Sequence, residues 1–142
     1  MIVVPSENDV RDAFGQRFAR FSIPLHVTRR DARYEVELGG GGAQAYLAFE
    51  IDFANDIATN GCFGLAQEIP AFRRAHLALD IIAAAEDACA ALGIREAVVG
   101  LSTKDALWSH AGYSKVPNHE LSAYESRGVS TLFGFSTFRK RF

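Results

Sequence analysis

The sequence has few residues suited to metal, disulfide or membrane chemistry. Its 142 residues include only two cysteines, one methionine and one tryptophan, and Cys62 and Cys89 are not spaced as metal ligands are. We therefore expect both thiols to be reduced, in a cytoplasmic protein, and we predict no structural or catalytic metal. Residues 1–5 lack a basic segment followed by a long apolar run, so neither a signal peptide nor a membrane span is expected.

An excess of charge of one sign is also missing. The chain carries 15 Lys and Arg against 17 Asp and Glu, a formal charge of −2, which argues against a general role in binding nucleic acid or a membrane surface. The local exception is the run from Arg139 to Arg141, read as a solvated chain end or a contact for an acidic partner. With no repeat, linker or low-complexity segment, residues 1–142 are expected to form a single domain.

The front half of the chain alternates between helical and strand patterns. After a possible cap at Ser6, apolar residues recur at helical spacing from Val10 to Phe21, which predicts an amphipathic helix. Residues 34–38 and 45–53 then alternate apolar and polar side chains on either side of Gly39–Gly42. This pattern predicts an antiparallel hairpin with one buried face.

The second half predicts a crossover between parallel strands. Cys62–Ile69 is a short apolar strand, an Ala-rich helix follows and is closed by Gly93, and Ala97–Leu101 is a buried strand. A short helix over Lys104–Ala111 and two closing strands within Leu121–Phe138 complete the chain. Together these elements predict an α/β (α+β) fold, with a mixed, mostly antiparallel central sheet, a β-α-β crossover and flanking helices.

The turn between this strand and the Ala-rich helix is basic. Arg73 and Arg74 lie where the helix dipole already places positive partial charge, which is unfavourable unless an anion binds there. Because free backbone N–H groups at a helix N-terminus bind phosphate, the turn predicts a site for a phosphorylated cofactor. The alternative is a solvated turn whose side chains point away.

Residues 62–113 resemble the GNAT N-acetyltransferase superfamily. The family pattern Pro-x-x-Arg-x-x-Gly-x-Gly/Ala is similar to the run from Pro70 to Ala78, with His76 in place of the first glycine. The family pattern Ala-x-x-Leu-Tyr-x-x-x-Gly-Phe is similar to the run from Lys104 to Tyr113. A weaker likeness is to small GNAT-like proteins carried by phages.

The resemblance implies a site for acetyl-CoA as co-substrate. Backbone N–H groups from Arg74 to Ala78 would hold the pyrophosphate, and the gap between the strands ending at Ile69 and Leu101 would receive the pantetheine arm. His76 adds bulk in this loop but brings an imidazole donor. The residues that the resemblance assigns to the cofactor are Ile69, Arg73, Arg74, Ala75, His76, Leu77, Ala78 and Trp108.

Catalytic groups are less clearly marked than cofactor groups. Trp108 stands where the family has a tyrosine that protonates the leaving thiolate, and an indole cannot serve as that acid. For removal of the amine proton, Glu50 and Asp52 share the polar face of one strand, and His119 could titrate near neutrality. Glu50 and His119 are the candidate catalytic residues, each weighed against an ordinary surface position.

Three functions fit this sequence. The first is an acyl-CoA-dependent N-acyltransferase that transfers acetyl to an amine on a small molecule or protein by direct attack. The second is a GNAT-fold protein without catalysis, acting as a binding or structural component, for example in a phage particle or against a host protein. The third is a regulator that binds coenzyme A without turnover. The closing strands could also pair to form a homodimer.

Overall fold

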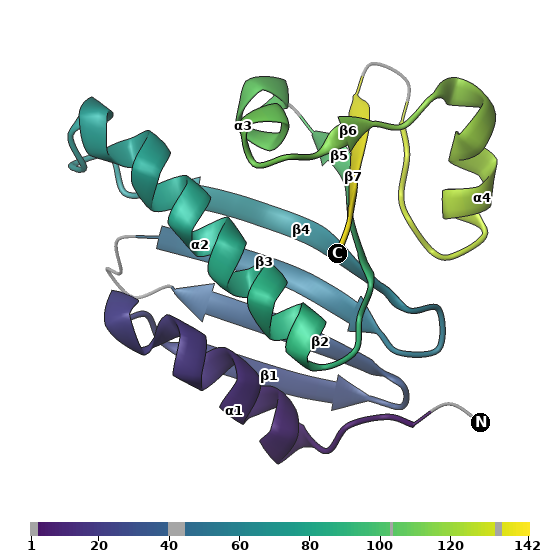
Figure 1. Cartoon of the computed structure of the whole chain (residues 1–142), viewed down its shortest axis with the longest axis horizontal. Helices are drawn as coiled ribbons and strands as arrows, with labels where there is room; N and C mark the ends of the chain where they lie inside the picture. The colour runs from purple at the N-terminus through teal and green to yellow at the C-terminus, as the bar shows by residue number, and fades with distance from the viewer. Residues whose placement is uncertain (1–2, 40–44, 103, 133–134) are drawn as a thin grey trace.

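The chain folds around one mixed sheet flanked by helices (Figure 1). The computed structural model describes residues 3–39, 45–102, 104–132 and 135–142, with backbone alone at 60–62. Within these residues the sheet has seven strands in the order β1-β2-β3-β4-β5-β7-β6. The elements in chain order are α1 (Glu7–Phe18), η1 (Ala19–Phe21), β1 (Leu25–Arg30), β2 (Arg33–Gly39), β3 (Ala45–Asp52), β4 (Ile57–Leu65), α2 (Ala71–Ala91), β5 (Glu96–Ser102), α3 (Asp105–His110), β6 (Ser114–Lys115), η2 (Asn118–Glu120), α4 (Leu121–Glu125) and β7 (Ser136–Arg141).

Strands β1 to β4 form an antiparallel meander. The predicted hairpin is confirmed as β2 and β3, with Val36 opposite Phe49 on the buried face; its turn falls largely on residues 40–44, outside the described residues. Strand β1 was not predicted from the sequence. Of its six residues only Val27 is fully buried, so the strand shows too little alternation to be recognised.

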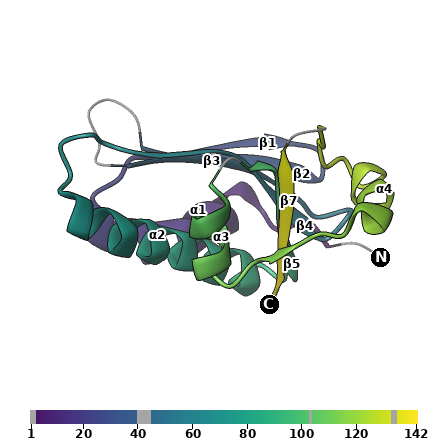
Figure 2. The same ribbon diagram turned by 90° about the horizontal axis from the view of Figure 1, so that it is seen from above.

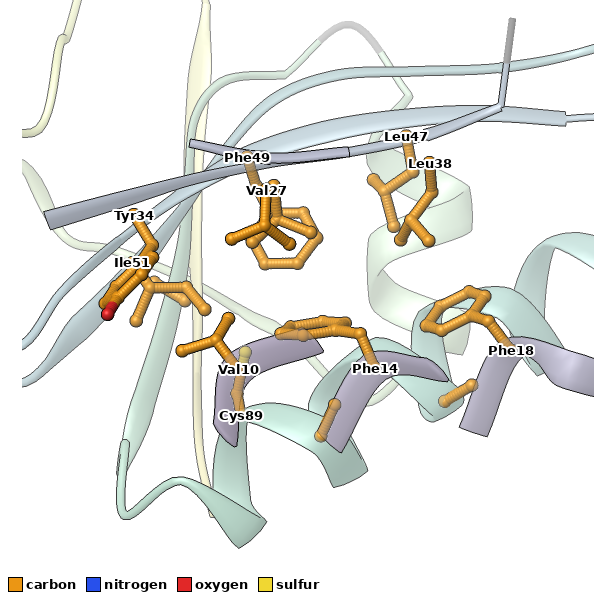
Figure 3. Close-up of a cluster of buried hydrophobic side chains, with 14 of the residues drawn as sticks. Val10, Phe14, Phe18, Val27, Tyr34, Leu38, Leu47, Phe49, Ile51 and Cys89 are labelled. Carbon is orange, nitrogen blue, oxygen red and sulfur yellow. The ribbon is translucent and has the colours of Figure 1, made fainter. Parts of the chain in front are cut away.

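One face of the meander carries the main core. Figure 3 shows Val10, Phe14 and Phe18 of α1 pointing at buried side chains of the strands, with Cys89 of α2 beside them. The Phe14 and Phe49 rings lie 5.4 Å apart between centroids, a favourable aromatic distance. The amphipathic first helix and the burial of Cys89 are therefore confirmed, and both helices lie on the same side of the sheet (Figure 2).

The parallel pair of strands separates soon after it begins. β4 and β5 are paired only from Ala58 to Asn60 on β4 and from Ala97 to Val99 on β5, and a bulge between Ala48 and Phe49 interrupts the neighbouring pairing of β3 with β4. Beyond these pairs β5 and β7 run across the direction of β1–β4 (Figures 1 and 2). The crossover through α2 confirms the predicted β-α-β unit, and it leaves the ends of β4 and β5 apart.

The closing part of the chain differs from its prediction. Leu121–Glu125 forms helix α4 rather than a strand, and the single long closing strand among the described residues is β7. Leu121 and Tyr124, three positions apart, both pack into a small cluster with Val98 and Val129, which is helical spacing. The aromatic and β-branched content of this segment had favoured strands. A helix forms because it places Leu121 and Tyr124, three residues apart, against the same buried cluster.

Candidate functional site

An open cleft of about 600 Å³ lies over the sheet face opposite α1 and α2. It runs from the polar side of β1–β3 to the place where β4 and β5 separate, and its far wall is the segment Gly128–Ser130. Its floor is therefore a solvated sheet face and its end is the gap between two parallel strands. The cleft brings together residues that are far apart in the sequence.

A row of polar side chains crosses the floor of this cleft. Thr28, Glu35, Glu50 and Thr59 are opposite one another on β1, β2, β3 and β4, so that two carboxylates face each other directly. Like charges in that position destabilise a sheet. Glu50 has a partner in Arg33 Nη1 at 3.4 Å and Glu35 has one in Arg30 Nη1 at 3.6 Å, so a cationic ligand on this floor would share or replace these partners.

A second row lies beside the first. His26 is opposite Glu37, and Tyr46 donates a hydrogen bond of 2.6 Å to Glu37 Oε1. The cleft thus holds three glutamates against one arginine, one lysine and one histidine. This floor is suited to binding an amine and accepting its proton.

Aromatic side chains and one lysine form the end of the cleft at the strand gap. Trp108 is 4% exposed and meets Tyr113 and Phe63 edge-on, with ring centroids 5.2 and 6.5 Å away. Lys104 Nζ donates a 3.0 Å hydrogen bond to the Phe63 carbonyl. The lysine therefore reaches from the β5 side of the gap to the β4 side.

The far wall of the cleft rests on a glycine of β5. A Cβ at Gly100 would collide with the Ser130 carbonyl oxygen and press on Val129 Cγ1, so only glycine allows the wall to approach this closely. Thr137 Oγ1 also donates to the Gly100 carbonyl at 3.1 Å. The shape of the cleft depends on this close packing.

Known structures share the fold of this chain. The chain matches a Vibrio cholerae protein provisionally described as a ribosomal-protein-serine acetyltransferase, with a TM-score of 0.50 and 13% identity over 78% of this chain and 63% of that one. It matches Tetrahymena GCN5 with a TM-score of 0.50 and 8% identity over 94% of this chain and 84% of that one. The chain has the GNAT fold. No protein-family model and no curated protein matches its sequence.

The predicted pyrophosphate loop of this GNAT fold is part of a helix. α2 begins at Ala71, and the N–H groups of Arg73 and Arg74 both donate to the Pro70 carbonyl, at 2.9 and 3.2 Å. The amides from Arg74 to Ala78 are consequently used within the helix, and the prediction that they are free is wrong for this structure. The cause is local: residues 71–77 contain no glycine and favour helix.

Free amides do remain at the start of α2. Pro70 occupies the N-cap without a side-chain cap, and among the described residues Ala71 and Phe72 have N–H groups with no acceptor. These two amides lie at the positive end of a 21-residue helix, where anions bind. The amides that are free to bind an anion thus lie about one turn N-terminal to Arg74–Ala78, where the sequence analysis expected them.

The side chains assigned to the cofactor differ in whether they are exposed beside the free amides. Arg73 and His76 are exposed on α2, whereas Arg74 Nη1 donates to the Ala66 carbonyl at 2.7 Å and so closes the loop onto itself. Ile69 is half-buried, and its amide also donates to Ala66. Only Arg73 combines an exposed guanidinium with a position beside the free amides. Ala75 and Leu77 lie on the next turn of α2, and Ala78 is buried.

The two candidate catalytic residues do not lie in the same site. Glu50 lines the cleft floor, but His119 is exposed in η2 and is not among the cleft-lining residues. Asp52, which shares the strand with Glu50, is buried and accepts hydrogen bonds from the amides of Ala54 and Asn55. Asp52 thus fixes the β3–β4 turn, and Glu50 is the one that faces the cleft.

Two residues of the cleft were missed by sequence analysis. Glu35 lies opposite Glu50, and the hairpin pattern would have revealed this pairing if the register of the turn had been known. Lys104 begins the run compared with the second family pattern, where the family has alanine, so the pattern gave it no role and only the tertiary contact with Phe63 reveals it. Among the described residues, no group of three His, Cys, Asp or Glu side chains could hold a metal, and no helix is long and apolar enough to cross a membrane.

A buried ion-pair network supports the wall of the cleft. Glu96 is 8% exposed at its side chain and accepts 2.6 and 2.8 Å hydrogen bonds from Arg127 and Tyr124, with Arg141 Nε at 3.3 Å. Arg127 also donates to the Asn55 carbonyl at 2.8 Å. The network joins α4 and the start of the wall to β5 and to the β3–β4 turn.

Stability should therefore fall in acid. Burial alone would raise the pKa of Glu96, but the hydrogen bonds from Arg127 and Tyr124 and the charge of Arg127 outweigh burial and lower it. A folded-state pKa below the ordinary value of about 4.3 means that the unfolded chain binds the proton more readily. The stabilisation is complete above that value and is lost as pH falls through the lower folded pKa. Urea unfolding should give constant stability from pH 7 to about 5.5 and a decline below about pH 5.

The turn after β3 should also lose stability as pH falls. Burial would raise the pKa of Asp52, but hydrogen bonds from Asn55 and the charge of Arg33 lower it. A stability that stays level down to pH 3.5 would show that these carboxylates are not stabilised by folding.

Proposed function

We propose that the chain is an acyl-CoA-dependent N-acyltransferase that transfers acetyl to a primary amine by direct attack. The observation that supports this most is the continuity of the cleft: one cavity joins the gap between β4 and β5 to an acidic sheet floor. A thioester in the gap and an amine on the floor would meet inside this cavity. The reaction needs that convergence more than any single residue.

Acetyl-CoA would supply the activated acyl group from the α2 side of the gap. Its diphosphate fits the residues present at the start of α2, where the amides of Ala71 and Phe72 are free and the Arg73 side chain is exposed. Two amides and a guanidinium are a smaller anion site than the predicted loop. We therefore expect the contacts of the pantetheine arm with the gap to contribute much of the affinity.

The acceptor amine would bind over the facing carboxylates. Glu50 lies one strand closer to the gap than Glu35, as the order of β2, β3 and β4 shows. We assign to Glu50 the removal of the amine proton, and to Glu35 the binding of the cationic acceptor. A positioned carboxylate base accelerates such a step by about 10²- to 10⁴-fold.

Thermal unfolding with and without acetyl-CoA tests the proposal. A ligand present at about 100 times its dissociation constant adds about 2.7 kcal/mol to stability, or roughly 5–10 °C in melting temperature for a domain of this size. Desulfo-coenzyme A should give a similar shift without turnover. Thiol release with a panel of primary amines then measures catalysis, and an unchanged melting temperature with saturating acetyl-CoA would contradict the proposal.

Arg73→Ala should weaken coenzyme A binding roughly tenfold. A hydrogen bond to a charged group contributes about 1.5–3 kcal/mol. Because Arg73 is exposed and its charge is screened, we expect a contribution near 1.5 kcal/mol, which corresponds to about tenfold in the dissociation constant. The dissociation constant is measured by calorimetry at low and high salt, and the difference between the proteins should shrink as salt rises. Arg29→Ala, at an exposed position of β1, is the control. Equal affinity in the Arg73 variant and the wild type would exclude this contact.

A GNAT-fold protein without catalysis is the second candidate function. The observation that favours it is the helical conformation of residues 71–78, which replaces the predicted phosphate loop. Such a chain would act as a binding or structural component, toward a phage or host protein partner, and would neither be stabilised by acetyl-CoA nor release thiol. A stabilising shift without thiol release would instead support a coenzyme A-binding regulator.

A further inference from the structure

The acyl transfer proposed above lacks a proton donor for the leaving thiolate. Trp108 stands at the position of the family's acid, and its indole N–H does not dissociate near neutral pH. Tyr113, the nearest phenol to Trp108, is not among the residues that line the cleft. Burial and the charge of Glu86 raise the pKa of Tyr113 well above its ordinary value, which makes it a poorer acid.

Lys104 places an ammonium group in the same part of the cleft. Its backbone begins α3, and Trp108 N–H donates to the Lys104 carbonyl at 3.3 Å, so the two residues lie one helical turn apart. Its Nζ donates to the Phe63 carbonyl at 3.0 Å and lies 5.5 Å from the centre of the Phe63 ring. Lys104, Phe63 and Trp108 all line the cleft where β4 and β5 separate.

The local backbone holds Lys104 in this place. Its N–H donates to Ser102 Oγ at 3.1 Å, and Ser136 Oγ donates to Asp105 Oδ2 at 3.1 Å on the next residue. β5, β7 and α3 thus fix the base of the side chain, while four methylene groups leave its tip able to turn. Its contact with the Phe63 carbonyl spans the gap that a thioester would enter.

We propose that Lys104 is the general acid of the acyl transfer, in place of the family's tyrosine; this role rests on the proposed function. The acceptor nitrogen, in its neutral form, bonds to the carbonyl carbon of the thioester and gives a proton to Glu50, which later releases that proton to solvent. The carbon–sulfur bond breaks, its electron pair goes to sulfur, and an Nζ proton of Lys104 passes to that sulfur to form the thiol. The neutral amine of Lys104 then takes a proton from solvent.

An alkyl ammonium suits this task chemically. Reference pKa values are about 10.4 for a lysine ammonium and about 10 for a tyrosine phenol, so the two groups are acids of similar strength. The ammonium adds a positive charge near a sulfur that becomes negative as the bond breaks, and such charges stabilise a transition state strongly in a site of low dielectric. The ammonium therefore supplies what the indole lacks.

Kinetics of Lys104→Met test the role. With acetyl-CoA and a primary amine, kcat should fall about 100-fold or more, while the dissociation constant of desulfo-coenzyme A changes less than about threefold. Lys104→Arg should not restore kcat, because a guanidinium holds its protons too tightly to give one up. Lys115→Met, at an exposed position of β6, is the matched control and should keep wild-type kcat.

A thioester with an acidic thiol separates proton donation from a structural effect. With S-acetyl 4-nitrothiophenol as donor, the leaving thiolate needs no proton, and Lys104→Met should retain activity within about twofold of wild type. Equal losses with both donors, or no loss with acetyl-CoA, would overturn this role alone. Wild-type protein that releases no thiol would overturn the proposed function and this role together.

Discussion

Glu50→Gln is expected to lower kcat for acyl transfer about 100-fold or more, with little change in stability. The amide keeps the size and hydrogen-bonding reach of the carboxylate but cannot accept the amine proton. The free energy of unfolding should stay within about 0.5 kcal/mol, because the variant loses an exposed contact with Arg33 and also removes a like charge opposite Glu35. Initial rates of thiol release over a range of amine concentrations measure kcat and KM separately.

Glu35→Gln provides the contrast within the same row. Since Glu35 is assigned to acceptor binding, its loss should raise KM for the amine about five- to tenfold and leave kcat within about threefold. Glu68→Gln, at an exposed residue outside the cleft, should change neither constant. If Glu50→Gln raised only KM, the carboxylate would bind the acceptor and the base would have to be another group.

Arg127→Met is expected to lower the free energy of unfolding by roughly 3 kcal/mol. The change leaves the buried Glu96 carboxylate without its 2.6 Å partner, and removing one member of a buried pair costs more than the pair itself contributes. It also removes the hydrogen bond to the Asn55 carbonyl. Urea unfolding and a melting temperature lower by about 10 °C would record the loss.

Arg141→Met serves as the control in the same network. Arg141 also contacts Glu96, at 3.3 Å, but its side chain is 72% exposed, and exposed ion pairs contribute about 0–1 kcal/mol. The two variants remove the same type of charge from the same carboxylate, but only Arg127 is partly buried, lies at 2.6 Å from Glu96 and also bonds the Asn55 carbonyl. Similar losses in both proteins would mean that the network stabilises through net charge and not through the buried contact.

Elements with a continuous local pattern could be predicted from the sequence. The first helix, the β2–β3 hairpin and the crossover helix each repeat a helical or alternating period, and β5 is marked by an apolar run. The strand before the crossover helix was predicted at Cys62–Ile69 but is β4, Ile57–Leu65, so its bounds were wrong. The end of α2 was predicted as well, because Gly93 adopts the positive φ of 88° that favours glycine. Elements without such a period were missed or misread. β1 buries only Val27 fully, and α4 is too short for its spacing to outweigh its strand-like composition.

Residues of the candidate site were likewise predictable only where a local pattern marked them. Alternation along β3 was enough to place Glu50 on the polar face, and the comparison of Trp108 with the family pattern located the end of the cleft. The start of α2 could not be predicted by analogy, because the resemblance implied a loop where the glycine-free residues favour helix. Glu35 and Lys104 became visible only through contacts between strands or across the gap.

The short pairing of β4 with β5 makes the molecule two lobes joined along a narrow seam. One lobe comprises α1, α2 and the meander with the main core, and the other comprises β5, β7 and α4. The two smaller clusters cross the seam, because one contains Ile57 of β4 and the other contains Ile82 of α2. Three backbone pairs also join the lobes, and Arg127 and Lys104 add polar contacts across the seam. A molecule bound between the lobes would contact both of them. Its binding would slow amide hydrogen exchange in β7, which lies on the lobe opposite α2.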